Sequence, residues 1–148
     1  VIHGRALIDP PLVQKDDTYE IDYQAFEKAI TGRTKLFILC NPHNPAGRVF
    51  TVHELERLAE ICLRHRLIIC ADEIHCDLLY PGYRHTPIAS LSPEIAGSTV
   101  TLMSPSKTFN LPGLGCGFAI IKNPSLQQIW ENTNTNAINK LTNNGFYS

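Results

Sequence analysis

Four short, mostly apolar runs constrain the fold of this chain more than any other feature. Each has the length of a β-strand and ends at a polar or turn-forming segment; they are residues 35–40, 67–71, 99–103 and 117–121. Strands covered on both faces have continuous rather than alternating apolar sequences, and such strands are typical of parallel sheets. The runs therefore predict an α/β fold, in which a mostly parallel sheet lies between two layers of helices.

A helical pattern between the first two runs supports this prediction. Thr51 and Glu54 form the T-x-x-E capping-box signature, and apolar residues follow at helical spacing: Leu55, Leu58, Ala59 and Cys62. We therefore expect a helix of about four turns here. Asn123 and Pro124 look like the cap and first position of another helix. Asp22 is expected to cap a shorter one, which buries Ala25, Phe26, Ala29 and Ile30.

Length, charge and cysteine content restrict the function classes. At 148 residues the chain suits one compact domain, and its net charge of -1 gives no reason to expect nucleic acid or an anionic membrane as partner. No apolar run approaches the roughly 20 residues of a membrane span. The 5 cysteines are odd in number and form no C-x-x-C pair, which favours free thiols in a reducing compartment. We therefore expect a cytoplasmic protein.

The opening residues of the chain are expected to form irregular or edge structure.

Three polar motifs begin where three of the predicted strands end. They are N-P-H-N-P-A-G at residues 41–47, D-E-I-H at residues 72–75 and S-P-S-K at residues 104–107. Open α/β sheets bind ligands at the carboxyl ends of their strands. The three motifs are therefore expected to converge on one site.

Lys107 is the candidate nucleophile of that site. A lysine is usually a solvated surface charge, but this one follows a buried strand and precedes an apolar, glycine-containing turn. A partly desolvated amine has a lowered pKa and can attack an aldehyde. The hydroxyl of Ser104 could hydrogen-bond a phosphate.

The other two motifs supply a carboxylate and an amide. Asp72 could cap a helix or join a buried ion pair, or it could hold its carboxylate at a pyridine nitrogen and keep that ring protonated. Ile74 could form an apolar floor beneath such a ring, and His75 could reach its phenolic oxygen. Asn44 lies between prolines; it is either part of a rigid turn without a ligand or a pre-organised donor to that oxygen.

The motifs, in this order and spacing, resemble those of the aspartate-aminotransferase-like, fold type I enzymes that use pyridoxal 5'-phosphate (PLP). The runs N-P-H-N-P-A-G-R, A-D-E-I-H-C-D-L and S-P-S-K-T-F-N-L-P-G-L are most similar to the MalY/PatB branch of cystathionine β-lyase-type carbon–sulfur lyases. The resemblance covers about residues 9–130. It implies that the cofactor is PLP and that members form homodimers.

The resemblance also assigns roles to particular residues. Lys107 binds the cofactor covalently and later moves the proton at the substrate α-carbon. Asp72 pairs with the pyridine nitrogen, and Asn44 contacts the ring oxygen, as His75 also could. Ser104, together with Ser106, binds the phosphate. No metal site is expected.

Two departures from the broader aminotransferase pattern favour the lyase branch. Aminotransferases commonly have a tyrosine where His75 stands, and often a phosphate-binding arginine where this chain has Gly115. Whole members of the family are at least twice as long as this chain. Residues 1–148 therefore look like a partial PLP-binding large domain, without the upstream phosphate-binding loop and the C-terminal small domain.

The expected activity is β-elimination from a sulfur-bearing amino acid, which gives a thiol, pyruvate and ammonia. Two alternatives stay open: a PLP-dependent aminotransferase, and an inactive truncated domain that retains the fold.

Three other interpretations lack supporting motifs. A helicase-like D-E-x-H box needs an upstream phosphate-binding loop that the sequence does not contain. An S-x-x-K acyl-transferase needs S-D-N and K-T-G partner motifs. A metal site formed by Cys40, His43, His75 and Cys76 fits no common zinc spacing.

Overall fold

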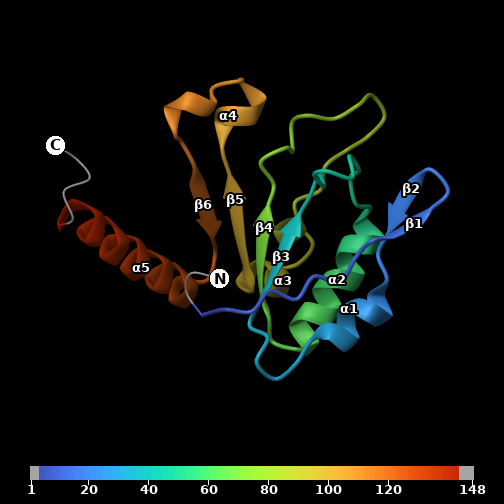
Figure 1. Ribbon diagram of the computed structural model, residues 1–148, viewed down its shortest axis with the longest axis horizontal. Helices are drawn as coiled ribbons and strands as arrows, with labels where there is room; N and C mark the ends of the chain where they lie inside the picture. The colour runs from blue at the N-terminus through green and yellow to red at the C-terminus, as the bar shows by residue number, and fades with distance from the viewer. Residues whose placement is uncertain (1–3, 144–148) are drawn as a thin grey trace.

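A mixed sheet of four strands forms the centre of the molecule (Figure 1). The computed structural model describes residues 4–143, without the side chains of residues 114 and 134–143. The strands occur in the order β3 (Leu36–Cys40), β4 (Ile68–Asp72), β5 (Thr99–Met103) and β6 (Phe118–Ile121). The first three are parallel, and β6 pairs with β5 antiparallel. All four predicted strands and the α/β fold are confirmed.

Two helices follow directly from the capping signals in the sequence. Helix α2 (Val52–Arg64) begins after Thr51, whose hydroxyl accepts from the Glu54 amide while the Glu54 carboxylate accepts from the Thr51 amide. Helix α1 (Tyr23–Ala29) begins after Asp22, whose carboxylate accepts from the Ala25 amide. In α1 only Phe26 is buried, and it packs edge-on against Phe37 of β3, with 4.8 Å between ring centroids.

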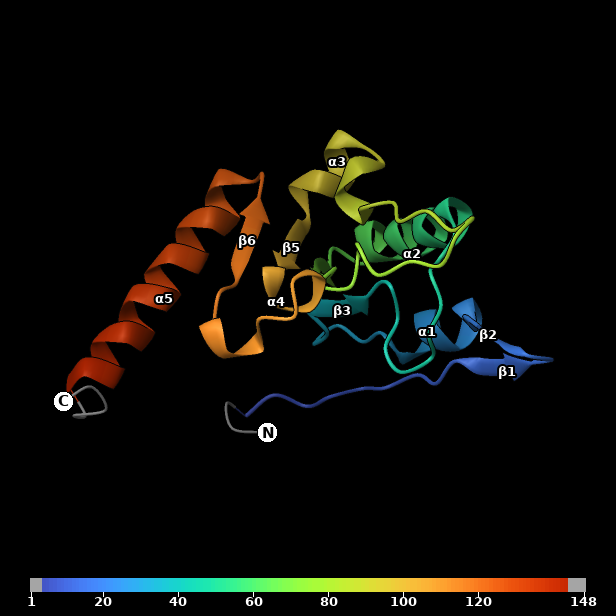
Figure 2. The same cartoon turned by 90° about the horizontal axis from the view of Figure 1, so that it is seen from above.

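Helices cover one face of the sheet (Figure 2). Helix α2 packs against β4, and α3 (Pro93–Gly97), with the 3₁₀ turn η1 (Ile88–Ser90), packs near β5. The core between these layers contains the buried side chains of Leu39, Leu55, Leu58, Ile69 and Ala71, among others.

The opposite face of the sheet has no helical layer within residues 4–143. Leu36 and Ile38 of β3 are 49% and 61% exposed on it. The continuous apolar sequence of the strands predicts helices on both faces of the sheet, but the described residues place helices on only one face. The second outer layer of the expected three-layer arrangement is therefore not formed by this part of the chain.

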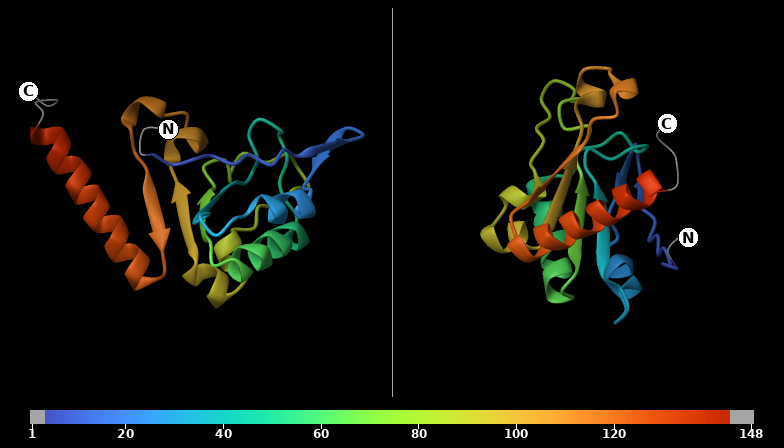
Figure 3. Two further views of the ribbon diagram at one scale, coloured as in Figure 1. Left: turned by 60° about the horizontal axis from the view of Figure 1, so that its bottom comes forward. Right: turned by 90° about the vertical axis from the view of Figure 1, so that its left-hand side faces the viewer.

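The two ends of the described chain lie outside the central sheet (Figure 3). The opening residues form a separate hairpin of β1 (Val13–Lys15) and β2 (Thr18–Glu20). At the other end, α5 (Pro124–Asn143) begins where predicted, and the Asn123 carboxamide accepts from the Ser125 amide at 2.9 Å. Of the helices in the described part of the chain, none is long and apolar enough to cross a membrane.

Candidate functional site

The three polar motifs lie at one edge of the sheet, at the carboxyl ends of β3, β4 and β5 (Figure 1). Because the three strands are parallel, their following loops leave the sheet on the same side. The register also brings two of the strand ends together, since Asp72 lies opposite Cys40 of β3 and opposite Leu102 of β5. This edge is the candidate site.

Lys107 lies in the short helix α4 (Pro105–Thr108), which begins directly after β5. Its side chain is exposed, and its amine has no polar partner among the residues that the structure describes. The amine is therefore available to react with a ligand.

The two serines before Lys107 are engaged in internal hydrogen bonds. The Ser104 oxygen accepts from the Ser106 amide at 3.1 Å and so caps α4. The Ser104 hydroxyl donates to the Cys116 carbonyl at 2.6 Å, and its oxygen lies 2.8 Å from the Ser106 hydroxyl. To bind a phosphate, Ser104 must exchange the Cys116 bond for one to the ligand.

Asp72 is the last residue of β4 and is half-buried. One carboxylate oxygen accepts from the Ile74 amide at 3.3 Å. Across residues 4–143, no protein donor reaches its other oxygen. The carboxylate can therefore accept a further hydrogen bond from a ligand.

Asn44 stands on a loop whose backbone is held at several points. Its amide N–H contacts the Cys40 sulfur at 3.5 Å. The His43 amide donates to the Arg48 carbonyl at 2.8 Å, and the Gly47 amide to the His43 carbonyl at 2.8 Å. Gly47 has φ +66°, a left-handed conformation that favours glycine. In the described chain the Asn44 carboxamide is exposed and makes no hydrogen bond, so it can donate to a ligand.

His75 contributes a buried polar atom to the same edge. Its Nδ1 is buried and has no hydrogen-bond partner within the described residues. Buried polar atoms in proteins are nearly always hydrogen-bonded. Among the predicted site residues in the described part of the chain, His75 is therefore the one whose side chain has an unsatisfied buried polar atom.

Two contacts at this edge were not anticipated from the sequence. The Thr108 hydroxyl donates to the Asp77 carboxylate at 2.8 Å and joins α4 to the loop that follows β4. Below the loops, Asn41, Glu73 and His85 form a buried polar chain. Glu73 had one signal in the sequence, because it directly follows an apolar strand. His85 had none.

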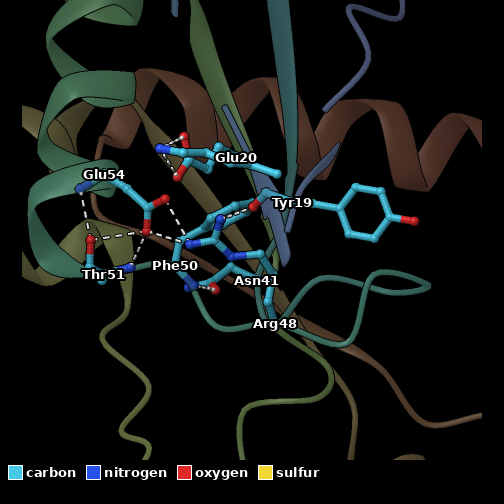
Figure 4. A network of polar contacts seen from close by, with 8 residues as sticks. Tyr19, Glu20, Asn41, Arg48, Phe50, Thr51 and Glu54 are labelled. Atoms are coloured by element: carbon cyan, nitrogen blue, oxygen red, sulfur yellow. Dashed lines mark hydrogen bonds and ion pairs between the residues drawn. The ribbon is translucent and has the colours of Figure 1, made fainter. Parts of the chain in front are cut away.

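A further polar network ties the Asn44 loop to α2 and to the hairpin (Figure 4). Arg48 lies 2.7 Å from each carboxylate oxygen of Glu54 and also donates to the Tyr19 carbonyl. A hollow of about 280 Å³ beside it is lined by Arg48 and Glu54 together with Tyr23, His53 and Arg57, among others. It contains none of the predicted site residues. The candidate site is therefore the carboxyl-terminal edge of the sheet, where Lys107, Asp72 and Asn44 lie.

Known proteins with this sequence pattern define the family. The chain matches the aminotransferase class I and II family over residues 3–144 and belongs to that family. It is 46% identical over 120 residues to the cystathionine beta-lyase PatB of Bacillus subtilis, a match that covers 80% of this chain and 31% of that protein. It is 41% identical over 101 residues to an aspartate aminotransferase of Geobacillus stearothermophilus, which covers 68% of this chain and 26% of that enzyme.

A solved structure shows the same fold. The structure of cystalysin from Treponema denticola, which contains a pyridoxal 5'-phosphate cofactor, superimposes with a TM-score of 0.83 at 41% identity. The match covers 86% of this chain and 32% of cystalysin. The chain thus spans about a quarter to a third of the length of these relatives.

Proposed function

We propose that this chain is the PLP-binding part of a carbon–sulfur β-lyase, which cleaves a sulfur-bearing amino acid to a thiol, pyruvate and ammonia. The observation that carries the proposal is the set of groups without internal partners at one sheet edge. An amine (Lys107), a carboxylate oxygen (Asp72) and a carboxamide (Asn44) are the groups that an aldehyde, a pyridine nitrogen and a phenolic oxygen require.

Bound at this edge, PLP would supply an electron-accepting ring for the electron pair released at the substrate α-carbon. Lys107 would bind the cofactor aldehyde and move the α-proton. The Asp72 carboxylate would keep the ring nitrogen protonated, which strengthens that electron acceptance. The amide of Asn44 would donate to the ring oxygen from a loop that needs no reordering.

Two residues favour the lyase over an aminotransferase. His75 stands where aminotransferases commonly have a tyrosine. Gly115 stands where many have a phosphate-binding arginine, and it has φ +57°, at which an arginine would be strained. The identity to PatB supports the same choice. Ser104 and Ser106 would contact the phosphate, for which no arginine is available at position 115.

The whole protein is further proposed to be a cytoplasmic homodimer that acts on a small amino acid. All 5 cysteines are free, as expected in a reducing compartment. We also propose that residues 1–148 are part of a larger PLP-binding domain, and that an upstream phosphate-binding loop and a C-terminal small domain complete the site.

The test of the activity compares two products. The protein that carries this sequence is incubated with PLP and cystathionine, with and without a 2-oxo acid, and pyruvate and thiol are measured. Pyruvate and thiol in equal amounts without a 2-oxo acid support the lyase. Amino-group transfer that depends on the 2-oxo acid, without thiol release, would favour the aminotransferase. Neither product, in a protein that is folded, would favour the inactive domain. Lys107→Ala is the control, and it should abolish either activity.

A further inference from the structure

Glu73 is a buried carboxylate directly beside the candidate site. It is 1% exposed, and an ionised group in such a place needs hydrogen-bond partners. One of its oxygens accepts from the Ile88 amide at 3.1 Å, and the other lies 3.0 Å from His85 Nε2. The His85 side chain is also nearly buried, with 8% exposure. Both side chains therefore lie in the interior. Glu73 makes two bonds to the segment that contains His85 and Ile88.

The Phe50 backbone amide orients the Asn41 carboxamide, the first side chain in this series of contacts. The Phe50 amide can only donate, so the Asn41 oxygen accepts from it at 3.0 Å (Figure 4). The Asn41 nitrogen then faces His85 Nδ1 across a long contact of 3.5 Å and must donate to it. An imidazole that accepts at Nδ1 carries its proton at Nε2. In this tautomer His85 Nε2 donates to the Glu73 carboxyl group.

These contacts connect the loop that carries Asn44 to the end of β4, where Asp72 lies. Asn41 closes the base of the Asn44 loop through Phe50, and its own amide donates to the Asp72 carbonyl at 3.0 Å. The Glu73 amide donates to the Leu102 carbonyl of β5 at 3.1 Å.

Side chains alternate between the faces of a strand. Along β4, Ile69 and Ala71 are buried, as is Glu73 just beyond it, whereas Cys70 and Asp72 are half-buried on the opposite face. Anchoring Glu73 in the core therefore determines the direction in which Asp72 leaves the sheet.

We propose that Glu73 and His85 are positioning residues for the cofactor ring. Through Asn41 they set the position of the Asn44 amide relative to the Asp72 carboxylate, and so set the two contacts that orient the ring. This inference rests on the proposed PLP site.

The test measures cofactor binding and ring orientation in the full-length protein. PLP is removed and titrated back, and its affinity and its induced circular dichroism are recorded for wild type, His85→Leu and His85→Gln. His85→Leu loses both hydrogen bonds and should weaken PLP binding by about tenfold, the order seen when the hydrogen-bond partners of metal-binding side chains are removed. It should also diminish the dichroism of the bound cofactor. His85→Gln keeps a donor to Glu73 and should restore most of both.

His65→Leu is the matched control. His65 also lies 3.0 Å from a glutamate, Glu27, but on the surface between α1 and α2. This variant should bind PLP with wild-type affinity and dichroism. Glu73→Gln keeps the shape of the side chain and loses one of its two hydrogen bonds. It should therefore show a smaller loss of PLP affinity and dichroism than His85→Leu. If His85→Leu does not fold, Glu73→Gln provides the test.

Wild-type affinity and dichroism in both Glu73→Gln and His85→Leu would overturn the inference. So would an equal loss in the His65→Leu control, because the effect would then be general instability. A wild-type protein that does not bind PLP overturns both this inference and the proposed function. A wild type that binds PLP without lyase activity overturns the proposed reaction alone.

Discussion

The Thr108 hydroxyl donates a 2.8 Å hydrogen bond to the carboxylate of Asp77, which precedes it by 31 positions in the chain. The bond joins the helix that carries Lys107 to the loop that follows Asp72. Besides the backbone pairing of β4 with β5, it is a direct side-chain tie between these two parts of the candidate site.

Loss of this bond should loosen α4 with little effect on stability. Thr108→Val is expected to slow the covalent capture of PLP by Lys107 several-fold, because the amine is held less often in a reactive position. Its free energy of unfolding should fall by about 1 kcal/mol or less. Stopped-flow absorbance measures the capture rate. Thr133→Val, which removes a 2.7 Å bond to the Ile129 carbonyl within α5, should leave the rate unchanged. An equal slowing in both variants would contradict the role of Thr108.

Glu54 should make stability depend on pH in the acid range. Burial raises the pKa of its carboxyl, but the bonds from Thr51 and Arg48 outweigh burial and hold the pKa below its ordinary value of 4.5. A depressed pKa in the folded state means stabilisation that is present above the unfolded value and is lost as the pH falls through the folded value.

The corresponding variant is Glu54→Gln. At pH 7 its free energy of unfolding should be lower than that of wild type by about 1.5–3 kcal/mol, the range for hydrogen bonds to charged groups. The difference should shrink as the pH falls below 4.5, the ordinary value of this group. Urea unfolding at a series of pH values measures it, with the exposed Glu56→Gln on the same helix as control. A difference that does not change with pH would contradict this account.

The cysteines should differ in reactivity toward iodoacetamide. Burial raises the pKa of the Cys62 thiol to about 12, and burial also raises the pKa of Cys70. Since the thiolate is the reacting species, Cys62 should react only after unfolding. Cys116 is exposed and should be labelled first. Mass spectrometry of labelled peptides distinguishes the sites, and rapid labelling of Cys62 in folded protein would be inconsistent with its position in the core.

The contact between α2 and the sheet should dominate stability. Leu55 is fully buried, and Leu55→Ala should lower the free energy of unfolding by about 2–5 kcal/mol through loss of burial and formation of a cavity. Val52 on the same helix is 46% exposed, and Val52→Ala should cost about 0.5 kcal/mol or less. Urea unfolding measures both, and similar losses in the two variants would show that α2 does not pack as described.

The sequence predicted the elements well because their signals are local. The apolar runs gave all four strands, and the Thr51–Glu54 box gave the start of α2. The direction of β6 was not predicted. No helix between Met103 and Phe118 is long enough to return the chain across the sheet, so β6 pairs antiparallel.

The contacts within the candidate site depend on residues that are distant in the sequence. Glu73 is buried only because His85 and the Ile88 amide reach it from beyond the next loop. Likewise, the exposure of Leu36 and Ile38 depends on which segments cover that face of the sheet. Motifs could identify Lys107, Asp72 and Asn44 as candidates, because each lies in a polar motif that directly follows a predicted strand. They could not identify the buried contacts among Asn41, Glu73 and His85 that lie beside these candidates.

The covalent attachment point of PLP tests the central claim most directly. The protein is incubated with PLP, reduced with borohydride and digested, and the modified peptide is identified by mass spectrometry. We predict that the label is on Lys107 and that Lys107→Ala carries none at that peptide. Lys122, which is also exposed and lies just beyond β6, serves as the internal comparison. Labelling of Lys122 and Lys107 to the same extent, or no labelling of Lys107, would contradict the account.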